Sequence, residues 1–402
     1  MKKLRIYLLT ITVLSLAAGH FFFPEKRIDE REFLRQIFPD VQFTLKKDEL
    51  RYYRSDEGYV AFNSYDIAPS LRGYAGPIKT LLVLTPKGRI AGIKILDHKE
   101  TKNYVHYMET PQYLSRFIGK RVNDPFEVDK DIDGITRATV SVEALARIVK
   151  ESSENIASNV LGIEVRTEVE KTSAGVGWLI YSVLFCFAFI FYYVTRRSKK
   201  MLRMRDVSLI AGIFVIGLYL SSPFSILHIF NIILLRPSSS LLWYTIIITT
   251  ILSIMLAGRF YCGWLCPFGA LAEFIGRLPF RKWSISSEID DKWRYLKYFL
   301  LGSIIFIVLF SRRAEFGNYE TYVTLFSFHG NYLTWTLVGI SLLANIRIER
   351  FWCRYLCPVA ALTGLLSRKD SGYVSRNDCP VANKPNPYIS ECIRCNRCYL
   401  KD

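Results

Sequence analysis

One cysteine motif occurs twice in this chain, each time directly after a long apolar run. The pattern Cys-x3-Cys-Pro begins at Cys262 and again at Cys353, 91 residues further on, and an arginine and two aromatic residues precede both copies. A bilayer can hide apolar runs of this kind, because roughly 17 to 25 helical residues cross its hydrocarbon core. The sequence therefore predicts a duplicated, thiol-bearing module at the edge of a membrane domain.

The composition indicates that two environments share the chain. Half of the 402 residues are hydrophobic, yet 22% are charged and the net charge is +17. This is too apolar for an ordinary soluble protein and too charged for a chain that lies wholly in lipid. Much of the excess Lys and Arg flanks apolar runs, where positive charge fixes orientation. We therefore expect membrane lipid as a partner and no nucleic acid.

Six apolar runs predict about six transmembrane helices. The third run is interrupted by Ser221-Ser222-Pro223, so we interpret the apolar piece 224–235 as a kinked extension or an interfacial helix. The six runs are Ile6 to Phe23, Gly175 to Val194, Val207 to Leu220, Leu241 to Ala257, Tyr295 to Phe310 and Tyr332 to Ile346.

Short basic segments predict the orientation. Lys2, Lys3 and Arg5 precede the first run, and six basic residues lie between the second and third. Both segments are expected in the cytoplasm, which places residues 24–174 outside and the loop 259–293 and the tail inside. The predicted location is a bacterial cytoplasmic (inner) membrane. Residues 1–23 are an anchor or a signal peptide, and the lack of a convincing cleavage site favours the anchor.

The outside segment is predicted to be a compact α+β domain. Residues 59–62, 79–84 and 89–96 have the pattern of strands, and a helix is expected to begin near Ser141. The hydroxyl-rich stretch 133–141 lies directly before this helix. Its hydroxyl groups can cap the helix, or the helix N-terminus can bind a phosphate. Periodicity does not separate these two interpretations.

This stretch resembles the flavinylation motif of FMN-binding domains from the Na+-translocating NADH:quinone reductase and the Rnf complex. The matching pattern is Asp133-Gly134-x-Thr136-x-Ala138-Thr139-x-Ser141, although Arg137 stands where those domains usually have a small residue. The run 73–79 and the segment from His98 through Glu100 and Thr101 are also similar to that domain. The resemblance implies FMN joined by a phosphoester to Ser141 and a flavin transferase as a partner.

Eight of the nine cysteines are predicted on the cytoplasmic side, where disulfides do not persist. Cys186 is the exception and is expected to be a packing residue in the membrane. The tail has the spacing Cys-x2-Cys-x2-Cys, which is typical of ferredoxin ligands. Eight thiolates match two [4Fe-4S] clusters, their division between clusters stays open, and zinc is the alternative metal. The ligands are Cys262, Cys266, Cys353, Cys357, Cys379, Cys392, Cys395 and Cys398.

A proline follows the second cysteine of each motif, which predicts that a helix begins there. The segments 268–276 and 359–366 are expected to be short amphipathic helices that lie along the membrane surface. Each second cysteine would then sit at a helix N-terminus, which favours an anionic thiolate. Nearby arginines, including Arg259 and Arg350, add positive charge.

Taken together, the chain resembles the NosR/NirI family of membrane flavo-iron-sulfur proteins, and its paired motif is similar to NapH-type quinol dehydrogenases. The resemblance implies electron transfer across the membrane. Electrons would enter at the iron-sulfur clusters or from the quinone pool, with a bound quinone as a further cofactor, and reach FMN. FMN would pass them to an exported reductase of the nitrous oxide or nitrite type. No side chain is assigned a catalytic role. A redox-sensing regulator or maturation factor and a cluster-free thiol-disulfide protein are the alternatives. The expected domains are 1–23, 24–174, 175–370 and 371–402.

Overall fold

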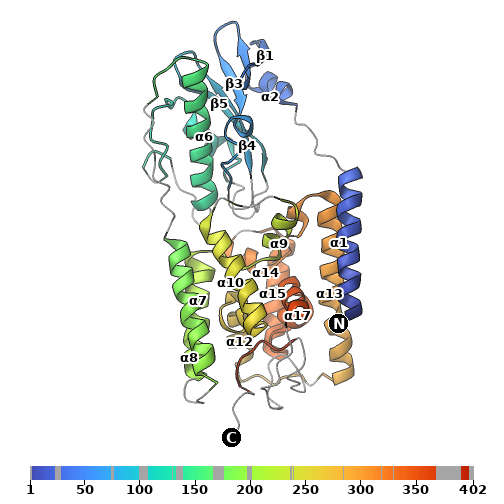
Figure 1. Cartoon of the computed structure of the whole chain (residues 1–402). Helices are drawn as coiled ribbons and strands as arrows, with labels where there is room; N and C mark the ends of the chain where they lie inside the picture. The colour runs from blue at the N-terminus through green and yellow to red at the C-terminus, as the bar shows by residue number, and fades with distance from the viewer. Residues whose placement is uncertain are drawn as a thin grey trace. The chain divides into compact units, whose positions relative to one another are not determined.

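The computed structural model divides the chain into two compact units (Figure 1). The helical unit comprises Met1–Phe23, Gly175–Phe230 and Leu241–Asp402, and the sheet unit comprises Pro24–Ala174 with Asn231–Ser240. The structure describes residues 2–22, 29–73, 77–98, 107–128, 130–132, 139–165, 176–196, 202–235, 238, 240–283, 285–317, 319–328, 330–367 and 391–397.

The sheet unit contains a five-stranded antiparallel sheet in which each strand pairs with its neighbour in sequence. The three strands predicted from the sequence are confirmed as β3 to β5, whereas β1 and β2 were not predicted. The strands are β1 (Phe43–Lys47), β2 (Arg51–Ser55), β3 (Val60–Asn63), β4 (Ile78–Leu84) and β5 (Ile90–His98).

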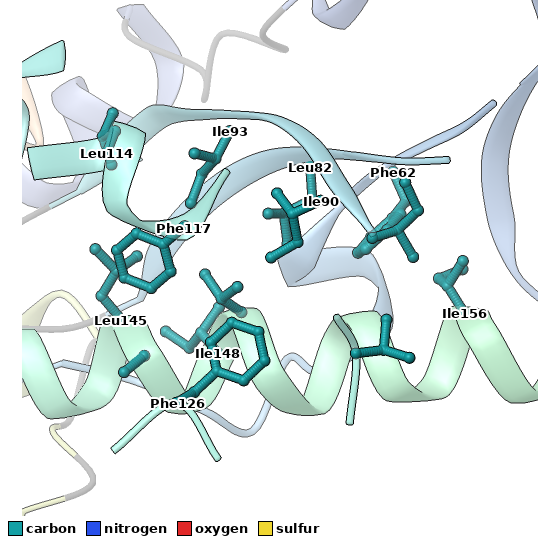
Figure 2. Packing of buried hydrophobic residues seen from close by; sticks show 14 of the residues in the cluster. Phe62, Leu82, Ile90, Ile93, Leu114, Phe117, Phe126, Leu145, Ile148 and Ile156 are labelled. Carbon is teal, nitrogen blue, oxygen red and sulfur yellow. The ribbon is translucent and has the colours of Figure 1, made fainter. Parts of the chain in front are cut away.

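Both faces of this sheet are covered, because alternate side chains of a strand point to opposite faces. Phe62 and Leu82 belong to the core that packs on α6 (Thr139–Asn159), as Figure 2 shows. Leu81 packs on the other face with Leu34 of α2 (Glu30–Ile37). The short helices of the unit are α3 (Ser64–Ile67), α5 (Pro111–Leu114) and the 3-10 turn η1 (Ser115–Phe117).

Among the described residues of the helical unit, three helices are long and apolar enough to cross a membrane. They are α1 (Lys2–Phe22), α7 (Gly177–Val194) and α13 (Ser287–Ser311), and α10 (Leu241–Ala257) is apolar but one residue shorter than α7. These three helices indicate a membrane protein. They coincide with the first, second and fifth spans predicted from the sequence.

The remaining predicted spans are shorter or interrupted. The third is α8 (Leu202–Ala211) continued by the π-helix η3 (Gly212–Tyr219), after which the chain breaks before α9 (Ile226–Ile233). The sixth is α15 (Tyr332–Arg347), which has 16 residues. This segment differs from an ordinary transmembrane helix in two ways: α8 begins with charged residues, and η3 has π-helical backbone. The other elements are α11 (Phe260–Trp264), α12 (Pro267–Gly276), η4 (Ala314–Gly317), α14 (Thr321–Ser327), α16 (Phe351–Tyr355) and α17 (Pro358–Leu366).

Candidate functional site

Each cysteine motif folds into two short helices joined at the second cysteine. Residues 259–276, with α11 and α12, form the first module, and residues 350–366, with α16 and α17, form the second. Cys266 accepts a hydrogen bond from the Gly269 amide at 3.4 Å, and Cys357 accepts one from the Ala360 amide at the same distance. The predicted position of both cysteines at a helix N-terminus is confirmed, and exposed amides there favour an anionic sulfur.

The helices that follow these cysteines do not lie along a surface. Seven residues of α12 and seven of α17 are buried, so neither helix has the exposed polar face of an interfacial helix. The prediction of surface-lying helices was wrong, because their polar residues bind within the protein. Glu273 of α12, for example, is 3% exposed.

The turn between the two helices of each module packs deep in the bundle. A Cβ atom at Gly212 would lie 2.6 Å from the carbonyl oxygen of Leu265, and one at Gly217 would lie 3.0 Å from the Cβ of Pro267. Both glycines belong to η3. In the second module the Leu356 carbonyl accepts a 2.9 Å hydrogen bond from Tyr319, which lies between η4 and α14. The turns that carry the second cysteines therefore pack against segments outside the modules.

The four module cysteines lie near one another. Cys262, Cys353 and Cys357 are buried, and Cys266 is partly buried. Burial raises the pKa of the Cys266 and Cys357 thiols, and the neighbouring Cys262 and Cys353 sulfurs raise both further. Four thiolates in this environment would repel one another. A positively charged metal centre would remove that penalty.

These thiols have the chemistry of cluster ligands. Within the described ranges, no group of three or more His, Cys, Asp and Glu side chains is placed to hold one metal ion. A [4Fe-4S] cluster takes a thiolate at each of four separate iron corners, so its ligands need not converge on one point. The chemistry of the donor set, four thiols from two equivalent modules, fits such a cluster.

Unsatisfied donors beside the thiols support the same fit. The Nε atoms of Arg259 and Arg350 and the Nε1 atom of Trp352 are buried and have no hydrogen-bond partner among the residues that the structure describes. Arg259 interacts electrostatically with Cys262 and Cys353. Buried donors without partners are rare and indicate a missing acceptor. The sulfurs of a cluster are acceptors of suitable charge.

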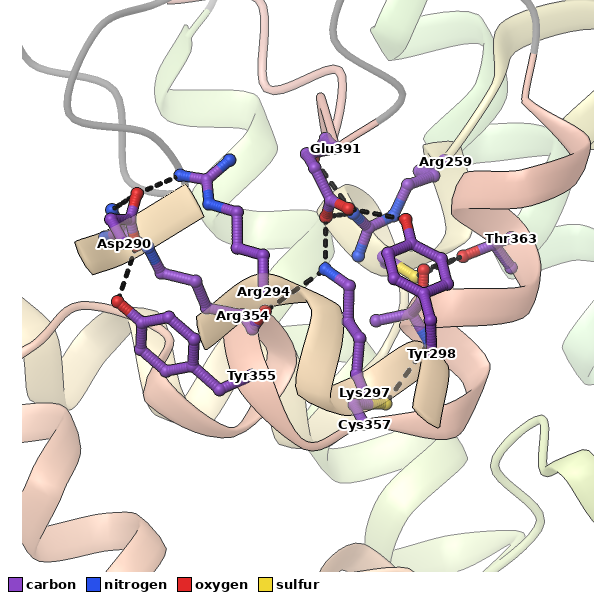
Figure 3. A network of polar contacts seen from close by, with 12 residues as sticks. Arg259, Asp290, Arg294, Lys297, Tyr298, Arg354, Tyr355, Cys357, Thr363 and Glu391 are labelled. Atoms are coloured by element: carbon purple, nitrogen blue, oxygen red, sulfur yellow. Dashed lines mark hydrogen bonds and ion pairs between the residues drawn. The ribbon is translucent and has the colours of Figure 1, made fainter. Parts of the chain in front are cut away.

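Two buried carboxylates join the modules to other segments. Glu273 binds Arg205 through two hydrogen bonds of 2.6 Å and Arg350 through one of 2.7 Å. Burial alone would raise the pKa of Glu273, but Arg205 and Arg350 hold it well below its usual value. Asp290 binds Arg294, Arg354 and Tyr355 (Figure 3). Side-chain ion pairs therefore join the two modules to each other and to neighbouring helices.

The described part of the tail, residues 391–397, binds the first module. Glu391 accepts a 2.8 Å hydrogen bond from Arg259 and also binds Lys297 and Tyr298 of α13 (Figure 3). This segment carries Cys392 and Cys395. The predicted ligands Cys379 and Cys398 lie outside the described residues.

The predicted flavin attachment residue lies in the first turn of α6. Ser141 is 4% exposed, directly before the apolar residues of α6 that pack on the sheet. His98 ends β5 and pairs with Glu109 at 2.8 Å. Asp133, Gly134, Thr136, Glu100 and Thr101 lie outside the described residues, and the structure describes only the backbone of Thr139.

Glu273, Glu391, Lys297 and Asp290 were missed by sequence reasoning. A glutamate in the otherwise apolar helix after Cys266 was a usable signal, because a charge in such surroundings needs a partner. Glu391 gave no signal, since an acidic residue beside a cysteine motif is ordinary on a polar tail.

Two family models match the chain. A 4Fe-4S binding domain matches residues 239–286 and 331–376, which contain both modules, and an FMN-binding domain matches residues 73–154, which contain Ser141. The tail cysteines lie outside both matches. FMN-binding and 4Fe-4S-binding domains on one chain indicate electron transfer.

Curated relatives agree with these domains over part of their length. The putative electron transport protein YccM of Escherichia coli is 31% identical over 36% of this chain and 41% of its own. The regulatory protein NosR of Stutzerimonas stutzeri is 28% identical over 51% of this chain and 33% of its own, and NirI of Paracoccus denitrificans is 26% identical over 55% and 38%. The chain spans less than half of each of these three relatives. It therefore unites an FMN-binding domain with a duplicated 4Fe-4S binding domain and is a distant relative of NosR, NirI and YccM.

Proposed function

We propose that this chain is a transmembrane electron-transfer protein that connects two [4Fe-4S] centres, and a quinone, to FMN attached to Ser141. The observation that carries the proposal is the proximity of four thiols from the two modules, three of them buried, beside unsatisfied arginine donors, in a chain that also has an FMN-binding domain. When bound, the clusters and the flavin supply the electron-carrying chemistry. The cysteines hold the iron, and Arg259 and Arg350 offset its negative ligands.

The proposed topology has six crossings, with the sheet unit outside and the tail in the cytoplasm. The proposal divides the chain at 1–23, 24–174, 175–370 and 371–402, in a bacterial inner membrane. Partners would be a flavin transferase, the quinone pool and an exported acceptor of the nitrous oxide or nitrite reductase type. This class of acceptor rests on the resemblance to the NosR/NirI family, and NosR and NirI are among the relatives.

Buried aromatic side chains support a route away from the first module. Tyr261 precedes Cys262, and its hydroxyl accepts a 2.8 Å hydrogen bond from the Phe224 amide. The Phe224 ring stacks on His228, and His228 stacks on Trp243, with centroids 5.6 and 5.8 Å apart. Trp243 lies at the start of α10, at the end farther from the module. Close packing of this kind excludes water from the route.

A preparation of the chain made with a flavin transferase tests the proposal. We expect mass spectrometry to find one FMN on the Ser141 peptide, and iron and acid-labile sulfide in the same sample. Ser141→Ala should remove the flavin, whereas Ser158→Ala, an exposed serine near the other end of α6, should keep it. Colourless wild-type protein without iron would refute the proposal, as would labelling that places the sheet unit and the tail in one compartment.

A regulatory role is the second candidate, because two relatives are named regulatory proteins. Ser141→Ala separates the two functions. If the chain senses a redox signal, the variant should change transcription of its target genes while reduction of the acceptor stays normal. If it supplies electrons, acceptor reduction should be lost first.

A further inference from the structure

The first module differs from the second at one position that faces the tail. Counting from the cysteines, Gly263 of the first module corresponds to Arg354 of the second. A Cβ atom at Gly263 would lie 1.9 Å from the carbonyl oxygen of Ile393. Only glycine leaves room for the tail backbone at that point. Arg354 fills the equivalent place and binds Asp290 instead.

Contacts on both sides of this glycine hold the tail. Trp264 donates to the Arg394 carbonyl at 3.0 Å, and Asn396 donates to the Tyr192 carbonyl at 2.7 Å and to the Thr195 hydroxyl at 2.8 Å. Ile393 is 1% exposed and Asn396 is fully buried. The segment 391–397 is thus bound to α7 and to the first module along its length.

Glu391 supplies the charged contact of this segment. Its carboxylate lies between Arg259 and the fully buried Lys297, and Arg259 also binds the Glu391 carbonyl at 2.9 Å. Arg259 is the first residue of the first module, just as Arg350 is the first residue of the second. Arg350 binds Glu273 within the first module, whereas Arg259 binds a residue of the tail.

Arg259 is consequently shared between two sets of thiols. It interacts electrostatically with Cys262 and Cys353 of the modules and with Cys392 of the tail. Arg394 is a second cation beside Cys392. A cation between two anionic centres stabilises the reduced form of both.

We propose that residues 391–397 are a docking strap that positions the tail cysteines against the first module, with Gly263 providing the space and Glu391 the charged contact. This inference depends on the proposed function in one respect, that the tail cysteines bind a cluster. It makes the module centre and the tail centre neighbours that share Arg259, so that electrons exchange between them inside the protein.

Limited trypsin digestion of the full chain tests the docking. Arg394 is 2% exposed, so cleavage after it should be slow in the wild-type protein. Gly263→Ala and Glu391→Gln should each speed this cleavage by about tenfold or more, because proteolysis follows the population of the released segment. Gly339→Ala, where a Cβ meets nothing within 4 Å, and Asp206→Asn, which removes a partly exposed ion pair with Arg277, are the matched controls.

The outcomes separate docking from the proposed function. Unchanged cleavage in Glu391→Gln, a substitution outside both modules, overturns the strap. Rapid cleavage of the wild-type protein or equal acceleration in the controls also overturns it. Iron and covalent flavin are measured in the same samples, so a protected tail without iron refutes the function and keeps the docking. In iron-loaded protein, Gly263→Ala should also remove the magnetic interaction between the two clusters in EPR spectra.

Discussion

Arg350 and Glu273 form a buried ion pair of 2.7 Å that joins the start of the second cysteine module to the helix of the first. Arg350 also donates to the Cys262 carbonyl at 2.8 Å, so one guanidinium contacts both the carboxylate and the backbone of a proposed ligand. The two modules are 91 residues apart in sequence, yet this pair sets their relative position. A cluster shared by four cysteines needs such a constraint, because each thiol must meet its own iron.

Glu273→Gln should destabilise the helical unit and reduce iron binding. Arg205 and Arg350 would remain buried without their carboxylate, and removal of one partner from a buried pair costs about 3–5 kcal/mol. The unfolding temperature of the detergent-solubilised protein and its iron content measure the effect. Asp206→Asn removes a partly exposed carboxylate that pairs with Arg277 and should change both by little. An iron content equal to wild type would contradict the role of Glu273.

Gly212→Ala should lower iron content without removing any polar group. Its Cβ would lie 2.6 Å from the Leu265 carbonyl oxygen, so the turn that ends at Cys266 must move. Overpacking of this kind costs about 1–3 kcal/mol. Gly339→Ala is the matched control, and iron and sulfide analysis is the measurement. Full iron content in Gly212→Ala would show that the turn can shift without loss of the centre.

The spacing of the cysteines and the proline that follows them predicted much of the module, because both act locally. Proline at the first position begins α12 and α17, and this local rule places Cys266 and Cys357 at helix N-termini. Strands β3 to β5 were likewise predictable from alternation and the turn 85–88. The domains for FMN and iron-sulfur followed from the motifs.

The depth of the modules was not predictable in this way. It depends on Gly212 and Gly217, whose contacts with Leu265 and Pro267 join segments more than 40 residues apart. A glycine in an apolar helix gives no indication of which segment will approach it. Strands β1 and β2 were missed because Lys46, Lys47, Arg51 and Arg54 mask their alternation. The partners of Glu391 come from two separate segments, the start of the first module and α13.

Thr363→Ala should lower the reduction potential of the module centre. The Thr363 hydroxyl donates to the Val359 carbonyl at 2.8 Å and lies 3.7 Å from the Cys262 sulfur, and the equivalent residue of the first module is Ala272. A Cys262 thiolate can only accept, so the hydroxyl must turn its one proton toward the sulfur when iron is bound. A hydrogen bond to a ligand sulfur stabilises the more negative, reduced form. Its loss should lower the midpoint by about 40 mV, taking about 1 kcal/mol for the bond. An EPR-monitored titration measures it, with Ser341→Ala, a buried hydroxyl that bonds its own helix, as control.

Glu320→Gln should make the stability of the helical unit less dependent on pH. The Glu320 carboxylate is buried in the segment before α14, where it binds the Ser225 hydroxyl and accepts a 3.1 Å hydrogen bond from the Ile226 amide. Burial raises the pKa of Glu320 from 4.5 to about 7, although the bonds to Ser225, Tyr322 and Ile226 lower it. The folded protein therefore holds this proton more tightly than the unfolded chain does.

The sign of the effect follows from this difference. Below about pH 4.5 both states are protonated and the contribution is complete. Between about pH 4.5 and 7 the unfolded chain releases this proton while the folded protein still holds it, so stability falls by about 3 kcal/mol at most. Wild-type unfolding temperatures should fall over this range relative to Glu320→Gln, whose neutral amide can keep the bonds to Ser225 and Ile226. Glu288→Gln, at an exposed position at the start of α13, should follow the wild-type curve. Parallel curves for wild type and Glu320→Gln would mean that Glu320 is already ionised at low pH, and that burial does not decide its charge.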